Sequence, residues 1–93
     1  MPEVNVTIVN RLGMHARASA KFVMAASNYS SKIWLRKVNG DKEVDGKSIM
    51  GIMMLAAAKG DTVIIGAEGS DEKLALDELS ALIGTKFGEE RKP

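Results

Sequence analysis

The arrangement of strands in this protein is clearest in residues 32–44, which read KIWLRKVNGDKEV. The first six of these residues, Lys32 to Lys37, predict a β-strand. The Asn39-Gly40 pair is a strong signal for a two-residue hairpin turn, so a short polar strand should follow at about residues 42–44. The segment therefore predicts two neighbouring antiparallel strands.

Two more strands are expected on either side of this hairpin. Residues 4–9 alternate apolar and polar side chains, which predicts a strand that buries Val4, Val6 and Ile8. Residues 62–67 are apolar and rich in β-branched residues, and they form the fourth predicted strand.

Three helices are predicted between and after the strands. The first covers residues 16–28, and the second is capped by Ser48 and runs from Ile49 to about Ala58. The third is capped by Ser70, with acidic residues in its first turn at positions 71 and 72. The predicted buried residues of the first and third helices are Ser19, Phe22, Val23, Ala26, Leu76, Leu79 and Ile83.

In order, these elements give β-α-β-β-α-β-α within one domain, residues 1–93. Each helix has one apolar stripe, so we predict an α+β fold. It is a two-layer sandwich in which three helices cover one face of a four-stranded antiparallel sheet. The charged run from Gly88 to Pro93 is expected to be a frayed end.

Composition limits the chemistry that the chain can perform. The formal net charge of +1 provides no strong field toward nucleic acid or an acidic membrane. The chain has no cysteine and one histidine, which excludes thiol catalysis, disulfides and metal sites made of thiolates or several histidines. Neither a signal peptide nor an apolar run of about 20 residues is visible. We therefore expect a cytoplasmic monomer, without metal or cofactor, that binds no nucleic acid and enters no membrane.

The single histidine lies in the run Gly13-Met14-His15-Ala16-Arg17, between a predicted strand and a predicted helix. Neutral imidazole is a nucleophile near physiological pH. First-turn amides of a helix bind phosphate oxygens, and Arg17 could offer a planar fork of donors to the same group. The alternative is a helix-cap histidine without chemistry. The place of His15 at a predicted helix start, two residues before Arg17, favours a site that holds an anion. That anion could be a phosphoryl group bound covalently to His15.

The second helix carries two further features. Its cap, Ser48, could also be phosphorylated, which would add about −1.5 to −2 charges beside free amides. Its residues 49–55 are too apolar to be buried on one face. They either pack the core or leave an adaptable surface for partners, and we expect a mixture. The expected buried residues are Ile52 and Leu55, and the expected partly exposed residues are Ile49, Met50 and Met53.

Two motifs, Gly13-Met14-His15-Ala16-Arg17 and Lys47-Ser48-Ile49-Met50-Gly51-Ile52-Met53, closely resemble those of HPr. HPr is the histidine-containing phosphocarrier family of the bacterial phosphoenolpyruvate-dependent phosphotransferase system. The resemblance spans nearly the whole chain and implies an open-faced β-sandwich. It implies that His15 takes a phosphoryl group on Nδ1 from phosphorylated enzyme I and passes it to a histidine of an enzyme IIA domain. Arg17 would help to hold the group.

The resemblance also assigns roles to the second motif. Ser48 corresponds to a regulatory serine that an ATP-dependent HPr kinase/phosphorylase modifies in bacteria that have this enzyme. The implied docking surface for partners comprises Met14, Ile49, Met50 and Met53.

One residue departs from the family pattern, because Ala18 stands where His-Ala-Arg is commonly followed by proline. Alanine is a good helix former and leaves one more amide free, so we expect the change to be tolerated. Variants with Ala18-Ser19 also resemble members from bacteria with reduced phosphotransferase systems, where the cascade is often nitrogen-related. The pathway could therefore be sugar uptake or nitrogen-related regulation.

Two other classes of function are alternatives to the carrier. In one, the chain is a regulatory protein-binding module controlled by phosphorylation of Ser48. The presence of His15 argues against that as the sole role, because purely regulatory forms replace the histidine. In the other, His15 is the general base of a small enzyme, but no substrate pocket or second histidine is evident. The predicted function is the phosphoryl carrier.

Overall fold

The computed structural model describes residues 2–88 and confirms the predicted order of elements. A short 3₁₀ helix, η1, follows the last predicted helix. The elements are β1 (Glu3–Thr7), α1 (Ala16–Ala26), β2 (Lys32–Lys37), β3 (Glu43–Asp45), α2 (Ile49–Met54), β4 (Thr62–Glu68), α3 (Glu72–Gly84) and η1 (Lys86–Gly88).

The four strands form one antiparallel sheet in the order β1-β4-β2-β3. Leu35 of β2 is paired with Ile65 of β4 on one side and with Val44 of β3 on the other. A hairpin joins β2 to β3 as predicted, but its turn is not the two-residue Asn39-Gly40 turn, because the last paired residues are Arg36 and Glu43. The Gly40 N–H donates to the carbonyl of Lys37 at 2.9 Å, and Asn39 is in the left-handed region at φ 70°. The third strand begins one residue later than predicted.

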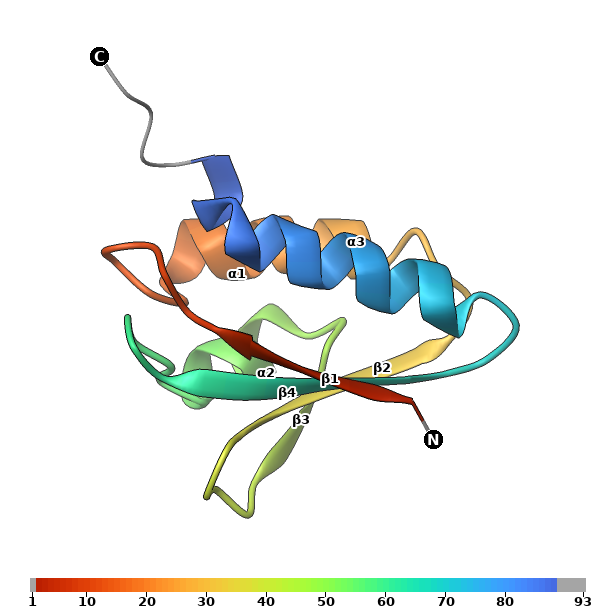
Figure 1. Ribbon diagram of the computed structural model, residues 1–93, viewed down its shortest axis with the longest axis horizontal. Helices are drawn as coiled ribbons and strands as arrows, with labels where there is room; N and C mark the ends of the chain where they lie inside the picture. Colours follow the sequence, from red (N-terminus) through yellow and green to blue (C-terminus); the bar gives the residue numbers. More distant parts are fainter. Residues whose placement is uncertain (1, 89–93) are drawn as a thin grey trace.

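All three helices bury side chains in one core against the same face of the sheet, as predicted. Figure 1 shows α1 and α3 side by side over the sheet, and α2 contacts α1. Every predicted buried residue of α3 is in this core. In α1, Phe22 and Ala26 are in it, Ser19 is fully buried but polar, and Val23 is only partly buried. The largest fully buried core side chains are Phe22, Ile8, Ile33, Leu35, Ile52, Ile65, Leu79, Ile83 and Val63.

Within residues 2–88, the other face of the sheet carries no helix and is mostly polar. Trp34 and Ile64 are its buried apolar residues and are not part of the helix-covered core. Trp34 lies flat against β4 because Gly66 has no side chain there: a Cβ at Gly66 would be 2.2 Å from Trp34 Cε2. These features make the fold the open-faced sandwich that the sequence indicates.

Three helices end or begin differently from the prediction. Helix α2 ends at Met54 instead of Ala58, because Ala56 takes a left-handed φ of 54° and the next residues bond elsewhere. Helix α1 ends at Ala26 instead of residue 28. The prediction that Ser70 caps α3 is wrong, since the N-cap residue is Asp71. The predicted frayed end after Gly88 lies outside the described residues.

Among residues 2–88, no helix has the length and apolar character needed to cross a membrane.

Candidate functional site

His15 is the N-cap residue of α1, and its half-buried ring faces back toward the helix. Its Nδ1 accepts a hydrogen bond from the backbone N–H of Arg17, at 3.3 Å. An imidazole nitrogen that accepts a hydrogen bond must carry its lone pair, which places the ring proton on Nε2. Nδ1 is therefore the ring nitrogen that carries a lone pair, and it lies beside the first-turn amides of α1.

The backbone on both sides of His15 is held in place. The Ser19 N–H donates to the carbonyl of His15 at 2.8 Å, and the Ser19 hydroxyl donates to the carbonyl of Met14 at 3.0 Å. The Met14 N–H donates to the carbonyl of Ala57, at 2.9 Å. These bonds fix the direction in which the His15 side chain leaves the chain.

The loop before His15 depends on two residues. Asn10 is fully buried, and its side-chain amide donates to the carbonyl of Gly13 at 2.8 Å. Gly13 has φ +64°, and a Cβ there would lie 2.7 Å from the carbonyl oxygen of Ala57. Only glycine combines this backbone conformation with so close an approach. The loop is thus pressed against the chain that follows α2.

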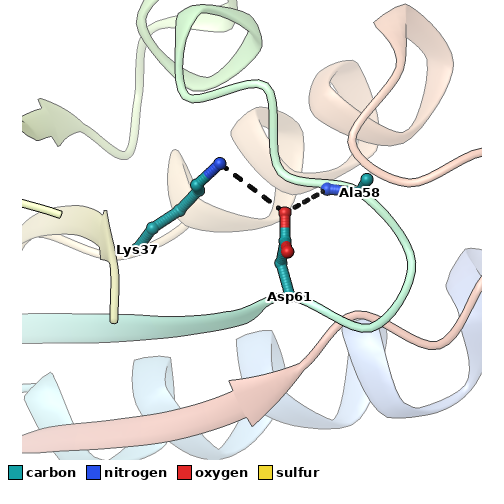
Figure 2. Close-up of polar contacts among 3 residues, drawn as sticks. All are labelled: Lys37, Ala58 and Asp61. Carbon is teal, nitrogen blue, oxygen red and sulfur yellow. Dashed lines mark hydrogen bonds and ion pairs between the residues drawn. The ribbon is translucent and has the colours of Figure 1, made fainter. Parts of the chain in front are cut away.

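The turn after α2 is the support for this loop, and Figure 2 shows how Asp61 shapes it. The Asp61 carboxylate accepts from the N–H of Ala58 at 2.9 Å and lies 3.6 Å from Lys37 Nζ. The hydrogen bond from Ala58, followed by the charge of Lys37, lowers the pKa of Asp61. Backbone bonds between Ile8 and residues 60 and 61 tie the same turn to the start of the loop. One turn therefore holds both ends of the segment that presents His15.

The first turn of α1 carries one basic residue and no acidic residue. Arg17 is exposed and belongs to the same turn as the amides that flank His15 Nδ1. Ala18 is fully buried, and its methyl group joins the core without disturbing the helix, which is regular from Ala16. The residue that replaces the common proline is thus compatible with the fold. The partial positive charge of the helix start and the arginine together suit a dianion.

Ser48 caps α2, as predicted. Its hydroxyl accepts from the N–H of Gly51 at 3.0 Å, and its carbonyl accepts from the N–H of Ile52 at 3.0 Å. Asp45 fixes the residues before the cap by accepting from the N–H of Lys47 at 2.9 Å. Ser48 as a residue is half-buried.

Helix α2 exposes an apolar face. With about 100° per residue, its exposed side chains occupy roughly 140° of the helix circumference, and its buried ones point the other way. The face comprises Ile49, Met50, Met53 and Met54, and we call it the α2 face. The predicted burial of Ile52 and Leu55 is confirmed, as is the exposure of Ile49, Met50 and Met53.

Met14 differs from its expected place on a docking surface. Its side chain is 5% exposed and packs in the core, so it offers no contact area to a partner. Met54, which was not predicted to dock, is 61% exposed on the α2 face. The exposed side chain of Leu12 lies three residues before His15.

Comparison with known proteins decides the family. The family model described as "PTS HPr component phosphorylation site" matches residues 2–85. The chain belongs to the HPr family. HPr proteins are phosphoryl carriers of the phosphotransferase system, so this chain is a carrier and not a catalyst.

Individual HPr proteins match along almost their whole length. The phosphocarrier protein HPr of Cupriavidus necator is 51% identical over 89 residues, which are 96% of this chain and 98% of the relative. The phosphocarrier protein NPr of Shewanella violacea is 39% identical over 87 residues, 94% of this chain and 93% of the relative. The crystal structure of HPr-C-His from Thermoanaerobacter tengcongensis superposes with a TM-score of 0.90 at 50% identity, covering 98% of this chain and all of that one.

Several residues that build the site were not identified from the sequence. The sequence predicts Ser19 only as a buried residue and assigns no role to Asn10 or Asp61, although all three support the His15 segment. For Asn10 the sequence carries a weak signal, because an asparagine followed three residues later by a glycine is typical of a turn. The role of Ala57, and the backbone bond from the Ile8 N–H to the Asp61 carbonyl, join segments more than 40 residues apart, which no local pattern reveals.

Proposed function

We propose that the protein accepts a phosphoryl group on Nδ1 of His15 from phosphorylated enzyme I and passes it to a histidine of an enzyme IIA domain in the cytoplasm. The observation that carries the proposal is the hydrogen bond from the Arg17 N–H to His15 Nδ1. It directs the lone pair of Nδ1 toward the start of α1, where a phosphoryl group has donors within reach.

The step itself is a transfer between two nucleophilic atoms. The Nδ1 lone pair attacks phosphorus, a P–N bond forms at His15, and the bond between phosphorus and the donor atom of enzyme I breaks with its electron pair staying on the donor. In the second transfer, the histidine of enzyme IIA attacks phosphorus, and the P–N bond at His15 breaks with its electron pair staying on Nδ1. Because the chain only stores the group, most of the transition-state stabilisation comes from its partners.

The charge of the site supports the stored state. A phosphoryl group on His15 displaces the Arg17 N–H from Nδ1 and takes its own oxygens to the first-turn amides. The guanidinium of Arg17 adds charge-assisted bonds, and no carboxylate stands in this turn to repel the group. Reversible transfer requires that the bound phosphoryl group is not much more stable on His15 than on its partners. The first-turn amides and the exposed Arg17 suit this requirement, because they hold the group at the surface.

The α2 face supplies the second part of a carrier, a surface that two different partners can use. Met50, Met53 and Met54 are flexible and polarizable, so they fit surfaces of different shape. A short helix that is apolar on its exposed side as well as its buried side is typical of an interaction site. We propose that enzyme I and enzyme IIA both dock across this face and the start of α1.

The experiment that tests the carrier proposal is phosphorylation by enzyme I and phosphoenolpyruvate, followed by intact-protein mass spectrometry. We expect one phosphoryl group, stable in base and lost in acid, and none on a His15→Ala variant. Arg17→Lys keeps the charge but loses the planar fork, so it should be labelled about tenfold more slowly. Full labelling of His15→Ala would place the chemistry elsewhere and overturn the proposal.

The pathway is open between the two kinds of relative. The relatives include proteins named HPr and a protein named NPr, which supports either a sugar-uptake or a nitrogen-related system. The test is to mix the phosphorylated protein with enzyme IIA domains of both systems, each taken from this protein's own bacterium. The domain that is phosphorylated at least tenfold faster identifies the pathway.

We also propose Ser48 as a regulatory phosphorylation site for an HPr kinase/phosphorylase, because its hydroxyl caps the helix that bears the α2 face. A phosphate there would place about two negative charges next to Ile49 and Met50, where an apolar partner surface would have to be desolvated. Ser48→Glu should slow phosphorylation of His15 by enzyme I, while Ser48→Ala should leave it nearly unchanged. Equal rates for both variants would remove this role.

A further inference from the structure

The exposed methionines of this protein gather mainly on one short helix. Met50 is 70%, Met54 61% and Met53 41% exposed, and all three belong to the α2 face. Met24 on α1 is 72% exposed, whereas Met14 is 5% exposed in the core. The chain has no cysteine, so these thioethers are its side chains most readily oxidised by peroxides.

We propose that Met50, Met53 and Met54 form an oxidation site. Hydroperoxides that oxidise it weaken the docking of partners and leave the chemistry of His15 unchanged. The inference rests on the proposed carrier function, because it requires the α2 face to be covered when the phosphoryl group is transferred. It adds a covalent modification and a chemical signal to that function.

The chemistry needs only the thioether and the oxidant. The sulfur lone pair attacks one oxygen of hydrogen peroxide, the O–O bond breaks, an S–O bond forms, and water leaves after a proton shift. Sulfur loses two electrons and the peroxide gains them. Methionine sulfoxide reductases reverse the product with a thiol as reductant, so the modification is reversible.

A sulfoxide on the α2 face opposes docking for a physical reason. The face presents no charged or hydrogen-bonding side chain from Ile49 to Leu55, so the partner surface that fits it must be largely apolar. A sulfoxide oxygen is well hydrated, and burying it without a hydrogen-bond donor is unfavourable. Docking is therefore weakened while the phosphohistidine itself is unchanged.

The fold should survive the modification. The residues that attach α2 to the core are Ile52 and Leu55, which have no sulfur, and the methionines of the α2 face extend into solvent. The core methionine, Met14, is protected by its burial. Oxidation thus alters a surface and leaves the packing beneath it intact.

The experiment compares the full-length protein with two variants. Met50→Leu/Met53→Leu/Met54→Leu keeps the size and apolar character of the α2 face but cannot be oxidised there. Met24→Leu removes an equally exposed thioether from α1 and serves as the matched control. Each protein is treated with hydrogen peroxide, sulfoxides are located by peptide mass spectrometry, and the thermal midpoint is measured to confirm the fold. The KM and kcat for phosphorylation by enzyme I follow, together with the hydrolysis half-life of the phosphohistidine.

We expect oxidation to raise KM about tenfold in the unsubstituted protein and in Met24→Leu, with kcat and the phosphohistidine half-life nearly unchanged. The KM of the triple variant should be the same before and after peroxide treatment. A sulfoxide reductase should restore the KM of the oxidised unsubstituted protein. An unchanged KM after complete oxidation of the α2 face overturns the inference and leaves the carrier proposal standing. Protection by Met24→Leu instead of the triple variant also overturns it, and an unoxidised protein that takes no phosphoryl group from enzyme I overturns both.

Discussion

Helices α1 and α3 lie side by side over the sheet, but their first turns are at opposite ends of the helical layer and are built differently (Figure 1). At α3, the N-cap Asp71 accepts four hydrogen bonds from the backbone and hydroxyl groups of Ser30 and Ser31, and Glu72 accepts from the Gly69 N–H at 3.0 Å. At α1, the cap is the ring of His15, and the first turn has an arginine and no acid.

The start of α3 is used for stability, whereas the start of α1 is left available for an anion. Carboxylates at α3 complement the macrodipole and join α3 to the loop before β2. At α1 the same complement is missing, so the positive end of the helix remains for an anion from outside. Placing a negative group on His15 would give α1 what α3 already has in its own sequence, and this supports the phosphoryl group proposed for His15.

The largest predicted effect is at Gly13, whose substitution by alanine should damage the loop that presents His15. The added Cβ would meet the Ala57 carbonyl at 2.7 Å and would strain a φ of +64°. We expect a loss of about 2–4 kcal/mol in the free energy of unfolding, measured in urea, and slower phosphorylation of His15.

Gly84 provides the control for this substitution. It lies at the end of α3 with no atom within 4 Å of an added Cβ. Gly84→Ala should therefore stabilise the protein by about 0.5 kcal/mol or leave it unchanged. Equal effects at positions 13 and 84 would show that the loop before His15 is not constrained by its contact with Ala57.

The second prediction gives α1 an acidic first turn like that of α3. Ala16→Glu places a carboxylate at an exposed position next to His15. It should stabilise α1 by about 0.5 kcal/mol through the macrodipole, but slow phosphorylation about tenfold because the new charge repels the phosphoryl group. Unfolding in urea and the rate of labelling by enzyme I measure the two effects separately.

Leu74→Glu is the matched control, because it adds the same charge to the first turn of α3 at an exposed position. It should have a similar effect on stability and none on labelling. A slower rate in both variants would mean that net charge, and not the start of α1, controls the transfer.

Most of the fold could be predicted from the sequence because its signals are local. The strand–turn–strand pattern around Asn39-Gly40, the alternation in β1 and the stripe from Leu76 to Ile83 depend only on neighbours within a few residues. His15 could be identified in the same way, since a nucleophile, an arginine and a helix start fall within one short run.

The errors arise where distant segments compete with local preference. The sequence from Ile49 onward favours a longer helix, but Met14 and Asp61 take the backbone groups of Ala57 and Ala58, so α2 ends early. Met14 was expected on the surface with its neighbours, yet the loop turns its side chain into the core. Met14 and Ala57 lie more than 40 residues apart, and Asp61, three residues after Ala58, is itself bonded to Ile8, so these contacts are visible only in the folded protein.

The third prediction removes the carboxylate that anchors α3. The hydrogen bonds from Ser31 and Ser30 lower the pKa of Asp71 from 3.8 to about 2. A carboxyl group whose pKa is depressed by folding stabilises the protein above its unfolded pKa, and this contribution is lost as the pH falls through the folded pKa. Asp71→Asn should therefore lower the thermal midpoint at pH 7, and its difference from the parent should shrink between about pH 4 and pH 2. A difference that is the same at pH 7 and pH 2 would show that charge plays no part in the anchor.

The smallest predicted effect tests the charge of Glu72 alone. Glu72→Gln keeps an oxygen that can accept from the Gly69 N–H but removes the negative charge from the first turn of α3. We expect a loss of about 0.5 kcal/mol in the free energy of unfolding at low salt, because the macrodipole then has no compensating charge beyond Asp71. Salt screens this interaction, so the loss should fall toward zero in 1 M sodium chloride. Labelling of His15 should be unaffected at either salt concentration, since the charge removed belongs to the helix start that takes no part in transfer. A slower labelling rate in Glu72→Gln would mean that the two helix starts are coupled, and that α3 contributes to holding the segment around His15.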